Sequence, residues 1–446
     1  MSVRTLFYLY QLRRNLRLNY SELQEMQRKR LKLILKHAYE NVPLYHRKFK
    51  AVGVKPEDVR SIDDLSKLPI TTKHEIQSAP LKDITAKNIN LNKCVKRTTS
   101  GSTGIPLTIF VDSAASYLES AIWARAFFEN DLRFYDKMAV VADPRSFPKR
   151  KSVYQHLRVM DRQYISIFDD VNKQLALLKD YKPQAIKGYP SSLVMLAEAL
   201  DRDGYGFKPR LVFTSAELLD NAGRKRINSS WQTDVLDNYA CNELSLLAWE
   251  CQEHMGYHTN IDGTVMEFID DGEPVASGER GKIVCTSLFN MAMPFIRYEI
   301  GDVGVPTDEQ CLCGRTLPLM KIVEGRTDDF LVTTKGRVVS PTIFFPYPFA
   351  NFEGIKQFRV IQRKRNEITI QIAANENFTN SAHVLEKAQK KIRRVFGEDM
   401  EVNFQILDAI PKDHNGKLRK VISLCNNTSQ LGNSHISQKE ELHCID

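Results

Sequence analysis

Arg97-Thr-Thr-Ser-Gly-Ser-Thr-Gly-Ile-Pro-Leu107 is the most informative stretch of this chain. Its central residues, 98–104, supply five hydroxyl side chains and two glycines. Glycines let the backbone come close to a ligand, so successive N–H groups can converge on one phosphate. The GxxxxGKS or GxxxxGKT spacing of a Walker A loop is absent. We therefore expect an anion-binding loop that differs from the P-loop.

The segments around this loop predict an α/β fold. A strand at 107–111 and a helix at 113–130 follow it directly. Strands and helices then alternate, with strands at 138–142, 185–188 and 210–214 and helices at 171–180, 191–203 and from about 220. This alternation indicates a mostly parallel sheet with crossover helices. Nucleotides bind at the carboxyl edge of such sheets, so we expect the loop at that edge.

The character of the chain changes in its last third. Short strands at 264–269, 281–287 and 295–298 predict a β subdomain attached to the core. A smaller α+β unit follows, with strands at 329–334, 357–362, 367–373 and 401–407 and a helix at 382–396. We expect a large domain at 1–327, a small lid domain at 328–424 and a disordered tail at 425–446.

Composition limits the classes of protein. The net charge is +9, and residues 1–60 account for that excess with fourteen Lys or Arg against five Asp or Glu. Residues 1–50 are predicted to be a basic helical segment that packs on the main domain, with contact to an anionic membrane surface as the alternative. No recognised nucleic-acid-binding module accompanies the charge. With no signal peptide, no membrane span and no disulfide framework among eight cysteines, we expect a cytoplasmic protein.

Two later segments complete an ordered set with the hydroxyl-rich loop. They are Gly325-Arg-Thr-Asp-Asp-Phe330 and Pro411-Lys-Asp-His-Asn-Gly-Lys-Leu-Arg-Lys420. In this order the three resemble the adenylate-forming superfamily of acyl-CoA synthetases, and within it the phenylacetate–CoA ligase branch and its relatives in capsular-polysaccharide clusters. The resemblance runs from about Tyr39 to Ile422. It implies ATP, Mg²⁺ and coenzyme A, and a lid that rotates about Asp328 between adenylation and thioester formation.

The resemblance also assigns the nucleotide site. The loop would screen the phosphates through Thr98, Thr99, Ser100, Gly101, Ser102, Thr103 and Gly104. Ala216 and Glu217 would form one wall of the adenine pocket, and Tyr239 would stack on the other face of the base. Asp302 would accept hydrogen bonds from both ribose hydroxyls, which suits a carboxylate with two acceptor oxygens.

Catalytic and acyl-binding roles come from the same resemblance. Glu243 would hold Mg²⁺ on the phosphates, Arg326 would contact ribose or phosphate, and Lys417 would be the adenylation lysine. The acyl pocket would be lined by Gly188, Tyr189 and Pro190. Superfamily members usually carry a lysine just after the hydroxyl-rich loop, and here Pro106-Leu107 replaces it. Pyrophosphate handling therefore depends more on the loop itself.

Cysteine spacing predicts a separate metal site. Cys251, His258 and the knuckle Cys311-Leu-Cys313 form an ordinary tetrahedral zinc set, with His254 as a substitute ligand. The set brackets a β-rich insert without an obvious large apolar core of its own. We expect structural zinc that supplies folding energy on the order of 10 kcal/mol.

Together these features predict an AMP-forming ligase that activates a carboxylic acid, an aryl or similar acid, and transfers it to coenzyme A. The first alternative is an adenylyltransferase that acts on a deazaflavin coenzyme without making a thioester. The second is a non-catalytic scaffold in polysaccharide biosynthesis. The sequence leaves the oligomeric state open.

Overall fold

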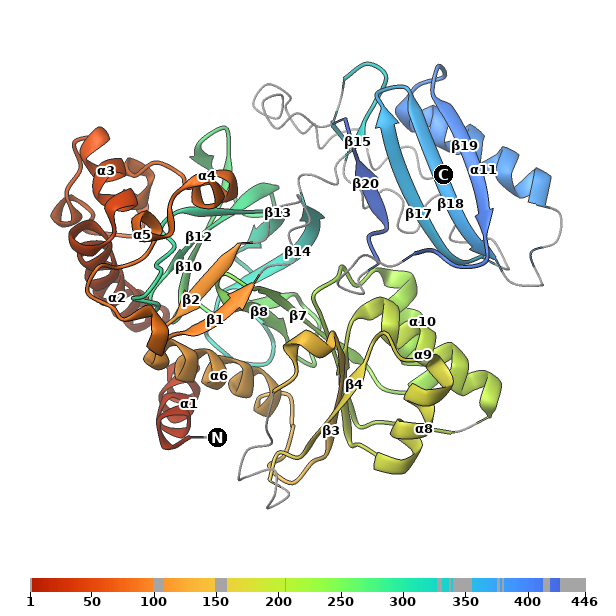
Figure 1. The fold of residues 1–446 in the computed structure, drawn as a ribbon, viewed down its shortest axis with the longest axis horizontal. Coiled ribbons are helices and arrows are strands. Elements are labelled where there is room, and N and C mark those ends of the chain that lie inside the picture. Colours follow the sequence, from red (N-terminus) through yellow and green to blue (C-terminus); the bar gives the residue numbers. More distant parts are fainter. Residues whose placement is uncertain are drawn as a thin grey trace. The chain divides into compact units, whose positions relative to one another are not determined.

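A computed structural model describes residues 2–98, 107–148, 159–204, 206–326, 331–336, 338–339, 355–374, 378, 381–411 and 418–425 (Figure 1). The chain divides into two compact units. One comprises Met1–Ala216 and Ile227–Val323, and the other comprises Glu217–Arg226 and Glu324–Asp446. The predicted boundary at 327/328, the mobility of the lid and the disordered tail stay predictions. The α/β class, with a large N-terminal and a small C-terminal domain, is confirmed.

Within the described residues, the first unit contains a 12-stranded sheet in the order β11-β10-β12-β13-β14-β9-β8-β7-β6-β5-β3-β4. Its parallel strands are β3 (Met138–Ala142), β4 (Arg162–Ser166), β5 (Ala185–Gly188), β6 (Leu211–Ser215) and β7 (Val235–Cys241). The remaining strands are β8 (Ser245–Glu250), β9 (Tyr257–Thr259), β10 (Thr264–Asp270), β11 (Glu273–Pro274), β12 (Gly281–Ser287), β13 (Tyr298–Thr307) and β14 (Leu319–Arg326).

This sheet confirms the predicted parallel core and changes the picture of the β subdomain. Strand β8 pairs antiparallel with β7, so the later strands continue the same sheet instead of forming a separate one. The predicted strand 295–298 is wrong for its first three residues, because β13 begins only at Tyr298. Arg297 has a φ of +44°, a left-handed backbone that cannot extend a strand.

Helices cover the sheet and form the N-terminal part of the unit. The α-helices of the first part are α1 (Val3–Asn15), α2 (Tyr20–Asn41), α3 (Pro43–Ala51), α4 (Lys73–Ser78), α5 (Leu81–Ile84) and α6 (Ser113–Phe128). Those of the parallel core are α8 (Val171–Tyr181), α9 (Pro190–Asp203) and α10 (Asn221–Trp231). Short 3₁₀ turns lie at Pro56–Asp58, Asp63–Lys67, Leu91–Lys93 and Pro144–Ser146. The helices expected within residues 3–50 are confirmed.

A buried polar network fixes α1 and α6 against the sheet. Arg125 of α6 donates to both carboxylate oxygens of Asp262, at 2.6 and 3.0 Å. Asn15 of α1 donates to the same carboxylate at 3.1 Å. Around them α1 packs through Leu9 and Leu12 into a hydrophobic cluster shared with α6. The first helix is therefore a rigid part of the unit.

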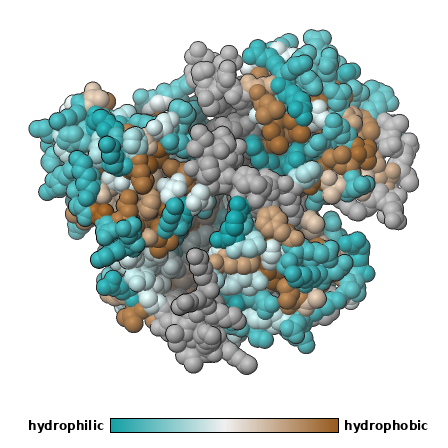
Figure 2. Space-filling view, viewed as in Figure 1, coloured by the Kyte–Doolittle hydropathy of each residue, from teal (hydrophilic) through white to brown (hydrophobic). Residues whose placement is uncertain are grey.

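The surface of this unit is mixed. On the face in Figure 2, hydrophobic side chains reach the surface in patches between the N-terminal helices and the hairpin of β1 (Val95–Thr98) and β2 (Thr108–Val111). None of the helices in the described part of the chain is long and apolar enough to cross a bilayer.

The second unit is built on a four-stranded sheet, counted over its described residues, in the order β19-β18-β17-β20. The strands are β17 (Ile355–Lys364), β18 (Glu367–Ala374), β19 (Glu401–Leu407) and β20 (Val421–Ser423), with α11 (Ser381–Phe396) beside them. A small pair, β15 (Leu331–Val332) and β16 (Val338–Val339), joins the same core. The predicted strands and helix of this unit are confirmed between 355 and 407, whereas 329–330 lie outside the described residues.

Candidate functional site

Tyr239 and Asp302 meet across the sheet where the parallel strands end. Tyr239 lies one residue beyond the last paired position of β7 against β6, which is Asn238. Its hydroxyl donates to Asp302 Oδ2 of β13 at 2.7 Å. Burial, and then the nearby Asp302 carboxylate, raises the pKa of Tyr239 well above its usual range. The phenol therefore remains a hydrogen-bond donor that fixes the orientation of the Asp302 carboxylate.

Glu243 lies in the turn between β7 and β8 and is almost fully buried, at 9% exposure. Tyr298 donates its hydroxyl to Glu243 Oε1 at 3.1 Å. Lys73 Nζ lies 3.9 Å from the same oxygen. Among the described residues no hydrogen bond reaches the other oxygen, Oε2. Contacts to Oε1 therefore hold the carboxylate in place, and Oε2 keeps its capacity to accept a hydrogen bond.

Lys73 is a site residue that the sequence interpretation missed. It begins α4 directly after Thr72, whose side chain caps that helix by accepting from the Glu75 N–H. The preceding residue, Thr71, is tied by its backbone to the Asp302 motif: its N–H donates to Arg297 O at 2.7 Å, and its carbonyl accepts from Glu299 N–H at 3.0 Å. The signal that could have identified Lys73 is its position as the first residue of a capped helix.

Two buried cysteines, Cys241 and Cys285, lie near the Glu243 and Asp302 carboxylates. Burial raises the pKa of Cys241 and of Cys285 well above the usual range. After burial, the negative charges of Glu243 and Asp302 both act on Cys241 in the same direction. The two acids thus share a region lined by neutral thiols and tyrosine hydroxyls, at the carboxyl end of the parallel strands.

The neighbouring strand ends carry the other predicted residues of the first unit. Gly188 ends β5, and a Cβ there would lie 2.6 Å from Leu193 Cδ2, so any larger residue would force the Leu193 side chain to shift. Tyr189 and Pro190 follow as the N-cap and first residue of α9. Ala216 follows β6 with a φ of +75°, a left-handed conformation that non-glycine residues adopt mainly where function or tight structure demands it. Glu217 belongs to the second unit.

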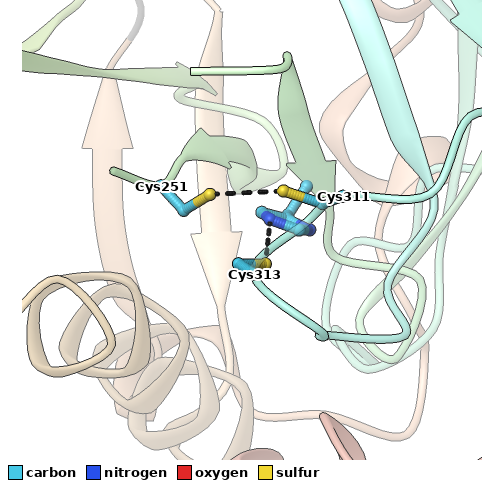
Figure 3. Close-up of side chains that lie close together, drawn as sticks. Cys251, Cys311 and Cys313 are labelled. Atoms are coloured by element: carbon cyan, nitrogen blue, oxygen red, sulfur yellow. Dashed lines mark hydrogen bonds between the residues drawn. The ribbon is translucent and has the colours of Figure 1, made fainter. Parts of the chain in front are cut away.

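Four predicted metal ligands come together from the end of β8, from β9 and from the connection between β13 and β14 (Figure 3). Cys251 Sγ lies 3.5 Å from Cys311 Sγ, and Cys313 Sγ lies 3.3 Å from His258 Nε2. All four ligand atoms lie within 4.8 Å of one another. Tetrahedral zinc with zinc–sulfur bonds of about 2.3 Å separates its ligand atoms by roughly 3.5–3.8 Å. The four residues therefore fit a zinc ion, and His254 is not one of this group.

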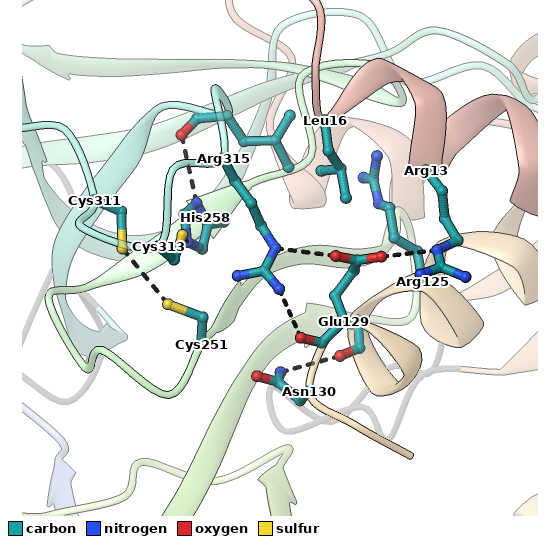
Figure 4. A network of polar contacts seen from close by, with 12 residues as sticks. Arg13, Leu16, Arg125, Glu129, Asn130, Cys251, His258, Cys311, Cys313 and Arg315 are labelled. Atoms are coloured by element: carbon teal, nitrogen blue, oxygen red, sulfur yellow. Dashed lines mark hydrogen bonds and ion pairs between the residues drawn. The ribbon is translucent and has the colours of Figure 1, made fainter. Parts of the chain in front are cut away.

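Surrounding contacts orient these ligands (Figure 4). The other ring nitrogen of His258, Nδ1, lies 3.4 Å from Leu317 O, the kind of backbone contact that directs the opposite nitrogen at a metal. Burial opposes ionisation of Cys313, yet the hydrogen bonds of His258 and Arg315 lower its pKa to about 5. Burial raises the pKa of Cys251 to about 12.

The cysteines of this group also pack against apolar side chains. Cys251 and Cys311 belong to a hydrophobic cluster that also contains Trp249, Leu317 and Leu319. The same cluster contains Leu9 and Leu12 of α1 and Leu118 of α6, so the insert shares its apolar packing with the helices, and zinc would add folding energy to that packing.

Comparisons with known proteins identify relatives of this chain. The family model described as the CapK C-terminal domain matches residues 331–424. Phenylacetate-coenzyme A ligase of Escherichia coli (strain K12) is 29% identical, with 91% of this chain and 95% of the relative covered. Its counterpart from Thermus thermophilus is 25% identical over 90% and 97%, and protein CapK of Staphylococcus aureus is 23% identical over 90% and 90%. The chain belongs to the phenylacetate–CoA ligase and CapK branch of the adenylate-forming ligases. It is a phenylacetate–CoA ligase-like enzyme of the AMP-forming kind.

Solved structures of this superfamily share the fold. That of 2-hydroxyisobutyryl-CoA ligase in the postadenylation state, in complex with R3-HIB-AMP, aligns with a TM-score of 0.76 and 21% identity over 94% of both chains. The same ligase in complex with 2-HIB-AMP and CoA aligns with a TM-score of 0.63 over 92% of this chain and 91% of that chain.

Several residues predicted for this ligase are not placed by the structure. Most of the hydroxyl-rich loop, Thr99 to Gly104, lies outside the described residues, as do Asp328 and Lys417. Thr98 is described as the last residue of β1, paired with Thr108. Arg326 ends β14, and nothing is described of its side chain. Their roles stay predictions.

Proposed function

We propose that the chain activates a carboxylic acid as an acyl adenylate and transfers the acyl group to coenzyme A, with an aryl or similarly compact acid as substrate. The observation that carries this proposal is the convergence of Tyr239, Asp302 and Glu243 at the carboxyl end of the parallel strands. In open α/β sheets ligands bind at this edge. Similarity to phenylacetate-coenzyme A ligases supports a carboxylic acid as the substrate and coenzyme A as the thiol that accepts the acyl group.

The chemistry consists of two balanced displacements. The acid's carboxylate oxygen attacks the α-phosphorus of ATP, an oxygen–phosphorus bond forms, and pyrophosphate leaves. The thiol sulfur of coenzyme A, having lost its proton, then attacks the acyl carbon, and AMP leaves. Catalysis of the first step requires that the enzyme hold the ribose and screen the phosphate charge.

Each described residue has a proposed part in these steps. Asp302 accepts from the ribose hydroxyls with its carboxylate oriented by Tyr239. Glu243, held by Tyr298, is the carboxylate that would hold Mg²⁺, since a hard cation takes oxygen ligands and Oε2 is not engaged by a described residue. The ion would neutralise phosphate charge when bound. Lys73 adds a positive charge beside Glu243.

The proposed roles of three further residues rest on the sequence alone. Lys417 is proposed to be the adenylation lysine, Arg326 to contact ribose or phosphate, and Asp328 to be the hinge. Lys417→Ala should abolish adenylation but leave thioester formation from a supplied acyl adenylate largely intact. The loss should be about a hundredfold or more, because a positioned cation in a transition state contributes ~3 kcal/mol. If both half-reactions fall equally, the rotating-lid assignment is wrong.

Pyrophosphate release tests the overall reaction. Wild-type protein, ATP and Mg²⁺ are incubated with a panel of aryl, fatty and hydroxy acids, with and without coenzyme A. We expect acid-dependent pyrophosphate release, and AMP release that requires coenzyme A. Transfer of AMP to a deazaflavin hydroxyl without thioester formation would favour the adenylyltransferase. Absence of any ATP-dependent reaction across both panels would favour the scaffold.

Asp302→Ala should raise the ATP concentration needed for half-maximal activity tenfold or more, because it removes charge-assisted hydrogen bonds of about 1.5–3 kcal/mol each.

A second proposal concerns the metal. We propose that Cys251, His258, Cys311 and Cys313 hold one structural zinc ion, since all four positions of a tetrahedral site are filled by the chain. Elemental analysis of purified, folded protein should find about one zinc per chain. Cys311→Ser should lower zinc content and thermal stability before it lowers turnover per folded molecule. Active, well-folded protein without zinc would contradict the proposal.

A further inference from the structure

The outer face of α1 carries an unusual stripe of side chains. Exposed fractions are 78% for Val3, 41% for Leu6, 57% for Phe7 and 68% for Tyr10. Their spacing of three and four residues places them on one side of the helix. The opposite side, with Leu9 and Leu12 among its residues, is buried. In an isolated soluble domain the exposed side of such a helix is usually polar.

The same stripe continues as positive charge. Arg13 and Arg14 occupy the last turn of α1 on the exposed side, and Arg17 follows just beyond it. Arg13 pairs with Glu129 at 2.8 Å, whereas the guanidinium groups of Arg14 and Arg17 have no partner among the described residues. Residues 1–21 contain four arginines and no acidic residue. The face is therefore apolar and aromatic over its first half and cationic over its second.

The stripe is held on a rigid support. Asn15 at the end of α1 is bound to the buried Asp262, and Leu16 O accepts from Thr316 Oγ1 at 3.1 Å. Glu129 bridges Arg13 of α1 and Arg315 beside the cysteine knuckle (Figure 4). These contacts fix which side of the helix faces outward. The exposed apolar side chains thus do not fold back onto the unit.

We propose that the outer face of α1, formed by Val3, Leu6, Phe7, Tyr10, Arg14 and Arg17, docks on an anionic lipid bilayer. The apolar and aromatic half would enter the boundary between headgroups and acyl chains, and the arginines would pair with lipid phosphates. The arrangement suits a helix that lies in the plane of the membrane. This surface would place an enzyme that makes acyl adenylates and thioesters beside a membrane.

Charge decides between this occupant and others. A second copy of the chain docked through the same face would bring arginines together without an acidic partner, since α1 contains none. A nucleic acid would engage the arginines and leave the four apolar side chains in water. An anionic bilayer satisfies both halves of the stripe at once.

Vesicle sedimentation tests the proposal on the full chain. Wild-type protein is spun with phosphatidylcholine vesicles that contain or lack phosphatidylglycerol, at low and high salt. We expect binding only to the anionic vesicles, and weaker binding at high salt. Phe7→Ser with Tyr10→Ser, and separately Arg14→Gln with Arg17→Gln, should each weaken binding about tenfold or more. Phe168→Ser is the matched control, because it removes an aromatic side chain that is 54% exposed elsewhere.

Each outcome decides. Loss of vesicle binding in both double variants, with unchanged thermal melting and unchanged binding of Phe168→Ser, supports the proposal. Failure of the wild-type protein to bind anionic vesicles overturns it. So does equal binding of wild-type protein and either folded double variant. A wild-type dimer that becomes a monomer in the Phe7→Ser/Tyr10→Ser variant, without vesicle binding, would assign the face to self-association instead. Pyrophosphate release without vesicles is measured in parallel and should be unchanged in all variants.

Discussion

Two buried carboxylates of the first unit, Asp262 and Glu243, are held in opposite ways. Asp262 is fully buried, and both of its oxygens accept from Arg125, with a further hydrogen bond from Asn15. Burial opposes its charge, yet Arg125 holds the pKa of Asp262 below the usual value. Glu243 accepts one hydrogen bond from a neutral phenol, and its lysine is 3.9 Å away.

The difference separates architecture from chemistry. A buried charge needs partners, and a carboxylate with both oxygens engaged by its neighbours serves to hold those neighbours in place. A carboxylate that is fixed by one oxygen and has no hydrogen bond from a described residue at the other can accept a cation or a ligand. We infer that the Asp262 network stabilises the fold and that the second oxygen of Glu243 is available to bind a cation or a ligand.

The largest effect should follow from breaking the Asp262 network. Arg125→Met leaves a fully buried carboxylate without its cation, and this should lower the free energy of unfolding by about 3–5 kcal/mol. Urea titration measures that change. Adding Asp262→Leu to the same chain should recover much of the loss, because both charges are then gone. A single variant as stable as wild type would show that this network does not stabilise the fold.

Next in size is the effect of Glu243→Gln, which should act on rate and not on folding. The amide keeps the size of the side chain but loses the charge that would hold Mg²⁺. Adenylation measured by pyrophosphate release should fall about 10²–10³-fold, with the unfolding free energy within about 1 kcal/mol of wild type.

The control is Glu267→Gln, which removes a partly buried carboxylate that pairs with Arg297 at 3.0 Å. This variant should lose stability while each folded molecule retains its activity. If the two variants behave alike, the distinction between closed and open carboxylates is not useful in this protein.

Much of this arrangement could be predicted from the sequence because it depends on local pattern. The strand at 401–407 and the helix at 113–130 follow from runs of apolar residues, and the structure gives them almost those bounds. The four zinc ligands were found because thiols and imidazole at such spacing have few other uses.

Other features depend on contacts between residues far apart in the chain. Lys73 approaches Glu243 only because Thr71 pairs with the backbone of the Asp302 motif. The strands β7 and β8 around Glu243 were not predicted, since a turn at 242–244 interrupts their apolar pattern. The sequence left open whether the outer side of α1 is exposed, because apolar residues at helical spacing normally indicate burial.

A smaller effect is expected for Tyr239→Phe. The ring that we propose to stack on adenine remains, but the hydrogen bond that orients Asp302 is lost. A hydrogen bond to a charged group contributes about 1.5–3 kcal/mol, so the apparent KM for ATP should rise about tenfold or more. Tyr257→Phe is the matched control, because Tyr257 of β9 donates to the Asp237 carboxylate at 2.9 Å in the same way. An equal change in KM for both variants would contradict a specific role for Tyr239.

The smallest effect should be a change in how stability varies with pH, caused by Lys187. Its ammonium lies 3.5 Å from the centre of the Trp123 ring and 5.5 Å from that of Phe127, on the face of the sheet covered by α6. Burial, and then the positive charge of Arg162, lowers the pKa of Lys187 to about 7. The ring face of Trp123 favours the charged form and limits this shift.

The sign of the effect follows from proton binding. Between about pH 7 and the ordinary lysine value, the unfolded chain binds a proton that the folded chain has released. Wild-type stability contributed by this site therefore rises with pH in that window, by at most about 1.4 kcal/mol per pH unit. Lys187→Met removes this dependence, so the stability of the variant relative to wild type should be greatest at pH 6–7 and decline by roughly 1–2 kcal/mol towards pH 9.

Urea titrations of both proteins across this range measure the decline. Lys137→Met controls for loss of a lysine over an aromatic ring, since Lys137 lies 5.3 Å from the Tyr181 ring centre and donates to Tyr181 O. Parallel pH profiles for wild type and Lys187→Met would mean that Lys187 keeps its proton throughout, held by the Trp123 ring.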